Sequence, residues 1–249
     1  MQDDLVVAEG GAPLSEVGRV VDTFIAPGKT FVDIRRSASW WLPCVLLILS
    51  TVVTIGYSVK RVGVDAMRDS MLQQMPKIQE MIDNGPPEQA AAMRKSFEGR
   101  IRSNIYTIPI GLIVAGFLVG ILYMATANFA FGGKATYWQM VAVFWYSLLP
   151  LIVSSILLSV LLAAGVGIDT YNAMNPLGTN PGYYMTGSSP MLVALLTAFD
   201  LFSIWVFALQ VVGISKVARI GTGAAFGTAI IWWVIYTGVF KLLPTLFYS

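Results

Sequence analysis

The chain has 249 residues, of which 56% are hydrophobic and only 12% charged, with 16 Lys and Arg against 14 Asp and Glu. A soluble protein carries about 25% charged residues, so the composition excludes an ordinary soluble domain and requires a bilayer around the long charge-free stretches. The absence of histidine also excludes a Ser/His/Asp triad and any site built on His metal ligands.

The N-terminal segment, residues 1–39, is expected to be cytoplasmic and to contain a short amphipathic helix. Ser15 is a candidate N-cap and Pro27 a stop. Between them, one helical face carries the apolar residues Val17, Val20, Val21, Phe24 and Ile25. This face either contacts lipid headgroups or a partner, or packs against the protein's own bundle. On the first interpretation, the candidate contact residues are Val17, Val20, Phe24, Arg35 and Arg36.

Charge-free runs of about 20 residues or more predict membrane-spanning helices. The five predicted spans cover residues 40–59, 105–131, 139–167, 190–214 and 224–243. Trp40 and Trp41 at the start of the first span are typical of interfacial anchors. The sequence therefore predicts an all-α, polytopic membrane protein with a bundle of five transmembrane helices.

Residues 60–104, between the first two spans, are expected to form an extramembrane helical hairpin. The first arm carries Met67, Met71 and Met75 on one face. The sequence at 84–87, Asn-Gly-Pro-Pro, breaks this helix, and Pro87 is suited to begin the returning one. The methionine face is either an adaptable docking surface or the inside of the hairpin.

The loops give the expected orientation. An odd number of spans places the two termini on opposite sides of the membrane. The short loops 132–138 and 215–223 contain Lys or Arg, whereas 169–189, expected to be an irregular aqueous loop, contains neither. The positive-inside rule then predicts a cytoplasmic N-terminus and an outside C-terminus in the inner membrane, although the basic residues of 60–104 favour the reverse.

Asp200 is the most unusual residue of the predicted spans, because it lies near the middle of the fourth. An ionised Asp at a span centre costs about 2.5–3.5 kcal/mol on insertion scales. It is either a neutral group that links helices, a site for a proton, cation or polar substrate, or a determinant for a partner protein. The candidate intramembrane polar site comprises Asp200, Thr197, Ser203 and Gln210 on the fourth span, with Asn128 and Ser147 as possible partners on the second and third.

No catalytic residues, metal site or cofactor are expected. The chain lacks a phosphate-binding Gly-Lys loop, a cysteine cluster and a concentrated basic tract, so nucleic acid is not an expected partner either. An aspartyl protease needs two carboxylates within hydrogen-bond reach, whereas Asp169 ends a predicted span and Asp200 lies within one. Cys44 has no second cysteine to pair with and is expected to be buried.

Five short motifs, taken in order, resemble the Yip family of Ypt/Rab-interacting proteins, in its prokaryotic form. They are FIAP at 24–27, TF at 30–31, FGGKATY at 131–137, YSLLP at 146–150 and DLFSIW at 200–205. The resemblance implies five spans and a cytosolic N-terminus, and its eukaryotic members assist vesicle traffic by engaging small GTPases. This sequence has Asp-Leu-Phe-Ser where those members have Asp-Leu-Tyr-Gly-Pro, so no GTPase-binding residue is carried over to it.

Together these observations predict a non-enzymatic membrane protein that organises protein partners or lipids. Its expected partners are membrane lipids and either another protein or further copies of itself. The alternative is a small transporter, or the membrane subunit of one, that uses Asp200.

Overall fold

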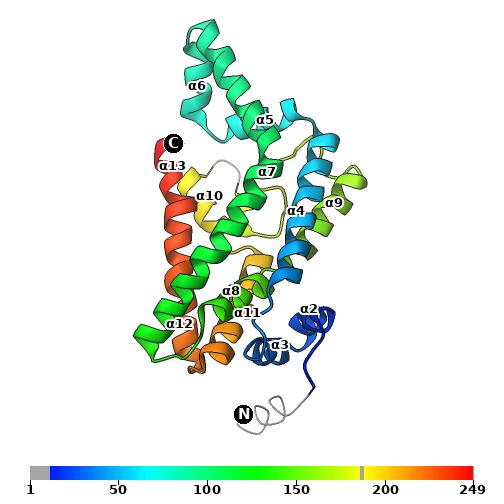
Figure 1. Ribbon diagram of the computed structural model, residues 1–249. Coiled ribbons are helices and arrows are strands. Elements are labelled where there is room, and N and C mark those ends of the chain that lie inside the picture. The colour runs from blue at the N-terminus through cyan, green and yellow to red at the C-terminus, as the bar shows by residue number, and fades with distance from the viewer. Residues whose placement is uncertain (1–11, 186–187, 249) are drawn as a thin grey trace. The chain divides into compact units, whose positions relative to one another are not determined.

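The computed structural model describes residues 12–185 and 188–248, and these form helices, turns and loops without strands. Five helices are long and apolar enough to cross a membrane (Figure 1). They are Trp41–Val62, Pro87–Ala130, Tyr137–Ala163, Leu201–Ala218 and Thr222–Phe247. The predicted class, an all-α protein with five candidate spans, is confirmed.

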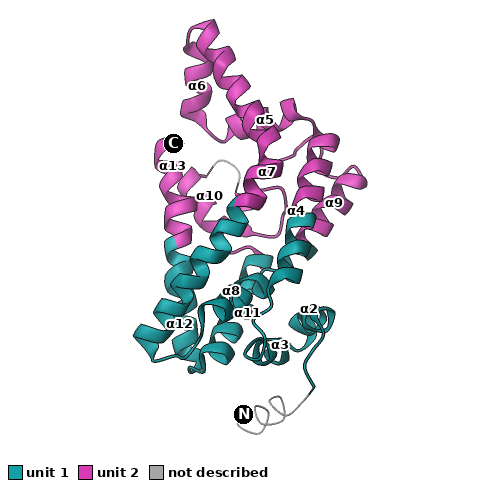
Figure 2. Cartoon of the chain, in the orientation of Figure 1, with its two compact units in different colours: residues 1–49, 111–153, 202–235 teal, residues 50–110, 154–201, 236–249 magenta. Residues whose placement is uncertain are grey.

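The chain divides into two compact units, each built from three separate stretches of sequence (Figure 2). Unit 1 comprises residues 1–49, 111–153 and 202–235, and unit 2 comprises residues 50–110, 154–201 and 236–249. Each unit is described in turn.

Unit 1 is centred on helix α8 (Tyr137–Ser147), whose residues from Met140 to Ser147 are all buried. Thr136 and Gln139 begin this helix with a reciprocal capping box, which satisfies two backbone N–H groups. Around α8 pack α2 (Glu16–Ile25), α3 (Pro27–Ile34), the first part of α4 (Trp41–Val62), α11 (Leu201–Ala218), α12 (Thr222–Tyr236) and the second part of α7 (Pro87–Ala125).

Two glycines let α7 approach α8 closely. A Cβ atom on Gly116 would stand 2.9 Å from the Trp145 ring, and one on Gly120 would stand 2.6 Å from Val141 Cγ2. Both distances are shorter than van der Waals contact, so any larger side chain would separate the helices. The Gly-x-x-x-Gly spacing therefore serves helix packing here.

Asn128 closes the corner after α7, on the π-helical turn η1 (Thr126–Ala130). Its amide nitrogen donates to the Ala135 carbonyl at 2.8 Å, and its amide oxygen accepts from the Ala135 N–H at 3.0 Å. This side chain holds the turn that leads into α8 together with backbone hydrogen bonds from the Gly132 and Gly133 N–H groups.

Unit 2 contains the hairpin of α5 (Val64–Gln73), α6 (Pro76–Asn84) and the beginning of α7. Met67 and Met75 are buried, together with Leu72 and Ile82. This burial favours the packing interpretation of the methionine face. From the hairpin α7 runs without interruption into the second candidate span, whose π-helical end η1 extends to Ala130.

The remainder of unit 2 comprises the end of α9 (Pro150–Ala163), the loop after it, and the short helices η2 (Pro181–Tyr184) and α10 (Pro190–Thr197). The chain ends in η3 (Thr237–Leu242) and α13 (Leu243–Tyr248). The described part of the loop after α9 packs in places against neighbouring elements. Asn180 is buried, and Gly182 lies so close to α10 that a Cβ would stand 2.7 Å from the Val193 carbonyl oxygen.

The fourth predicted span differs most from the structure. Instead of one helix over 190–214, α10 ends at Thr197 and α11 begins at Leu201. The Leu201 N–H bonds to the carbonyl of Thr179, in the preceding loop, at 3.1 Å. Because the loop supplies this acceptor, the backbone interrupts the helix without losing the hydrogen bond.

Candidate functional site

Helix α2 in unit 1 turns its polar residues inward and part of its apolar stripe outward. Arg19 and Thr23 are buried, at 3% and 0% exposure. Val17, Val21 and Ile25, spaced by four residues, are 66%, 49% and 74% exposed. A helix that packs on a protein core in water normally does the opposite, so this exposed face is the first candidate site.

A buried ion pair explains the inward turn of the polar face. Arg19 Nε donates to Asp33 Oδ2 on α3 at 2.7 Å, and Glu16 lies 3.5 Å from the same guanidinium. Burial disfavours the charged guanidinium, but the hydrogen bond to Asp33 and its charge outweigh this effect and raise the pKa of Arg19 above its usual value. The carbonyl of Arg19 also accepts the hydroxyls of Thr23 and Thr30 at 2.7 and 3.0 Å.

The apolar stripe predicted on α2 is divided between two directions. Val20 and Phe24 are partly buried and pack against the core of unit 1, and Phe24 meets Trp205 edge to face at 5.7 Å. These two residues anchor the helix on unit 1, and their contact with lipid or a partner stays a prediction. Helical periodicity does not predict this split, since the Asp33 partner that fixes the helix orientation lies fourteen residues from Arg19.

The basic residues beside α3 are held in different ways. The Arg35 carbonyl accepts from the Gln139 amide at 3.2 Å, and the Arg36 guanidinium lies 4.0 Å from Asp33. Arg36 and Lys29 are exposed. Two accessible cations therefore lie on the same small helical pair as the outward apolar face.

The second candidate site lies in unit 2, at the break between α10 and α11. Asp200 directly precedes the fourth candidate span instead of lying in its middle. The Thr179 hydroxyl donates to its carboxylate, while the Thr179 carbonyl binds the Leu201 N–H. A carboxylate at the N-terminal end of a helix is stabilised by the helix dipole.

Lys241, on η3, completes this polar cluster. Its ammonium donates to the carbonyl oxygen of Thr197, the last residue of α10, at 2.9 Å, and it is attracted by the charge of Asp200. Lys241 was not among the site residues predicted from the sequence, although it is the one charged residue between 222 and 247. A lone cation in an apolar helix is a signal for pairing with a carboxylate such as Asp200.

The structure assigns other contacts to two possible partners of Asp200. Asn128 uses its amide on Ala135, and the buried Ser147 hydroxyl has no hydrogen-bond partner among the described residues. Ser203 and Gln210 lie on α11 in unit 1, whereas Asp200 and Thr197 belong to unit 2. Thr197 donates its hydroxyl to the Ala194 carbonyl at 2.7 Å.

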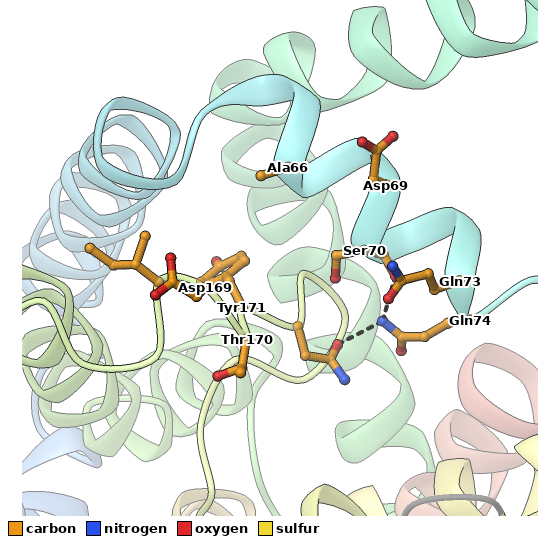
Figure 3. Close-up of a pocket in the computed structure, with 10 residues that line it drawn as sticks. Ala66, Asp69, Ser70, Gln73, Gln74, Asp169, Thr170 and Tyr171 are labelled. Carbon is orange, nitrogen blue, oxygen red and sulfur yellow. Dashed lines mark hydrogen bonds between the residues drawn. The ribbon is translucent and has the colours of Figure 1, made fainter.

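A polar cavity of about 610 Å³ lies in unit 2, between α5 and the loop after α9 (Figure 3). Its wall is held by the Gln74 amide, which donates to Asn172 at 2.8 Å, and by Ser70, which accepts the Ala173 N–H at 3.0 Å. Burial raises the pKa of Tyr171, against the opposing effect of a hydrogen bond with Ser58. Within the described ranges, no group of three or more acidic, Cys or His residues is placed to hold a metal ion.

Comparison with known proteins identifies the family of the chain. The Yip1 domain matches residues 21–243. The "Membrane protein YknW" of Bacillus subtilis (strain 168) is 27% identical over 244 residues, which cover 98% of this chain and 96% of that protein. No solved structure matches the chain. Because the domain covers nearly the whole sequence, this multi-pass membrane protein belongs to the Yip1 family.

Proposed function

We propose that this protein is a non-enzymatic membrane organiser that contacts lipid through the outer face of α2. The observation that carries the proposal is the reversed burial of α2, with Arg19 inside and Val17, Val21 and Ile25 outside. Fully removing a Val or Ile side chain from water contributes about 1.5–3 kcal/mol. A surface that covers these three side chains is therefore strongly favoured over water.

The position of α2 in the chain favours lipid as that surface. Six residues separate the end of α3 at Ile34 from the start of the first span at Trp41. Even fully extended, they reach only about 20 Å, which keeps the helical pair near the membrane. Lys29 and Arg36 add positive charge, and each basic residue near an anionic leaflet contributes about 1 kcal/mol to binding.

The proposed topology has the N-terminus in the cytoplasm and the C-terminus outside the inner membrane. The basic short loops 132–138 and 215–223 support this orientation. The anionic lipids that attract Lys29 and Arg36 would then belong to the cytoplasmic leaflet. Protein partners and self-association remain part of the proposed organising role. The quenching experiment below distinguishes a protein on the outer face of α2 from lipid on that face.

Lipid contact is tested by the depth of a probe on α2. In a Cys44→Ala background, Val21→Cys is labelled with an environment-sensitive fluorophore and reconstituted into vesicles that contain brominated lipids. Glu88→Cys, at an exposed polar position of the hairpin, is the matched control. We expect strong quenching at position 21 and little at position 88. Equal, weak quenching at both positions would contradict the proposal and direct attention to a protein partner.

Transport is a second candidate function, and the break at Asp200 is the observation that favours it. Transporters commonly bind substrates and coupling ions at discontinuous helices. If Asp200 carries a proton, proteoliposomes that contain the protein should relax an imposed pH gradient faster than empty ones. Asp200→Asn should abolish this difference. Equal relaxation with and without the wild-type protein would remove proton transport.

A further inference from the structure

The break between α10 and α11 concentrates oxygen atoms from three segments of unit 2. The Thr197 carbonyl is one of the last four of α10, which lack partners within the helix. The Asp200 carboxylate accepts the hydroxyl of Thr179, from the loop. These are a carbonyl, a carboxylate and a hydroxyl, and the carbonyl lies at the helix end where the dipole carries partial negative charge.

A cation already lies against one of these oxygens, the Thr197 carbonyl, and it belongs to the chain. The Lys241 ammonium bonds the Thr197 carbonyl at 2.9 Å and is attracted by Asp200. It is carried by η3, a π-helical segment, and such segments occur frequently at functional sites. On the same segment, the Thr237 hydroxyl is buried and makes no hydrogen bond with any residue that the structure describes.

We propose that this cluster is a monovalent-cation site in which the Lys241 ammonium serves as a tethered cation. Backbone carbonyls at the ends of interrupted helices are ligands that proteins use for sodium. The single carboxylate in the cluster matches one positive charge, whereas calcium sites usually combine more ligands and more charge. The ammonium supplies that charge from within the chain, so a free cation binds only when Lys241 is displaced.

The consequence is a competition between the chain's own amine and ions in solution. While Lys241 occupies the cluster, it joins η3 to the end of α10. When it is absent, the cluster should bind sodium or potassium, and a large organic cation should not fit. This inference is independent of the lipid contact of α2 and makes no claim of transport.

The test compares the thermal unfolding of purified full-length variants in detergent with sodium, potassium or choline chloride at equal ionic strength. We expect the wild type to unfold at the same temperature in all three salts. Lys241→Ala should be stabilised by sodium or potassium. At ten times the dissociation constant, the unfolding equilibrium constant falls about 11-fold, which raises the midpoint by about 3–6 °C for a chain of this size.

Three further variants identify the site. Lys241→Arg retains a tethered cation and should remain insensitive to the salt. Lys241→Ala with Asp200→Asn should lose the sodium effect. If Lys241→Ala does not fold, Lys241→Gln, whose amide still donates a hydrogen bond, replaces it with the same expectations. Binding of radioactive sodium to the neutral variant provides a direct measurement. Equal midpoints in sodium and choline without sodium binding, or a response that survives loss of Asp200, would overturn the proposal.

Discussion

The α2–α3 pair and the hairpin of α5, α6 and the start of α7 are both amphipathic in sequence, yet they bury opposite faces. The hairpin encloses Leu72 and Met75 and leaves most of its charges accessible. Helix α2 encloses Arg19 and leaves Ile25 exposed. An amphipathic pattern therefore shows that a helix has two faces, and the partner nearby decides which one turns inward.

An arginine links helices in both regions, but its surroundings differ. In the hairpin, Arg68 reaches Glu98 at 2.5 Å, Asp65 at 2.8 Å and Asp69 at 2.9 Å, and these acids are partly or largely exposed. Burial opposes the charge of Arg68, yet its hydrogen bonds to Glu98 and Asp69 raise its pKa above the usual value. In α2, both Arg19 and its partner Asp33 are buried. The ion pairs of Arg68 and Arg19 therefore contribute different amounts to the free energy of unfolding.

The largest effect is expected from Asp33→Ala, which leaves the Arg19 guanidinium buried without its main partner. Breaking a buried pair in this way costs about 3–5 kcal/mol. We expect α2 and α3 to become sensitive to limited proteolysis, with a lower unfolding temperature. Combining Asp33→Leu with Arg19→Met removes both charges and should restore most of the protection. If Asp33→Ala is as resistant as the wild type, the buried pair does not hold the two helices together.

A smaller effect on stability is expected from truncating one apolar residue in each region, and the two losses should differ. Leu72 is 1% exposed, so Leu72→Ala should destabilise the hairpin by about 2–5 kcal/mol. Val21 is 49% exposed, and Val21→Ala should change stability in detergent by less than about 0.5 kcal/mol. Thermal unfolding of both variants in the same detergent measures the contrast. Similar losses of stability in the two variants would mean that other parts of the protein cover the outer face of α2.

The smallest effect is expected from Glu98→Ala in the hairpin. This change removes one of three acids around Arg68, and the other two remain within 3 Å. Partly exposed pairs contribute about 0–1 kcal/mol, so the unfolding temperature should hardly change, whereas Asp33→Ala should lower it clearly. If Glu98→Ala and Asp33→Ala lower the unfolding temperature equally, the buried Arg19 pair is no stronger than the partly exposed Arg68 pair.

Hydropathy predicted the five spans because the bilayer thickness fixes how long an apolar helix must be. Hydropathy did not predict the helix break at Asp200. The Thr179 carbonyl accepts the Leu201 N–H at this break, and it lies in a loop whose position periodicity does not predict. The Lys241 contact was missed for a related reason, since it joins residues 44 positions apart. The family resemblance rests on short motifs in a fixed order, and the Yip1 match confirms it.

The two hydrogen bonds between the Asn128 side chain and the Ala135 backbone affect the order in which the chain folds. They join residues only seven positions apart, so closing this loop costs little chain entropy. The corner between the second and third spans can therefore form while the ribosome is still synthesising the rest of the protein. The contact between Lys241 and α10 joins residues 44 positions apart and can form only once Lys241 has been synthesised. We thus expect the second and third spans to pair early in folding, before η3 docks on α10.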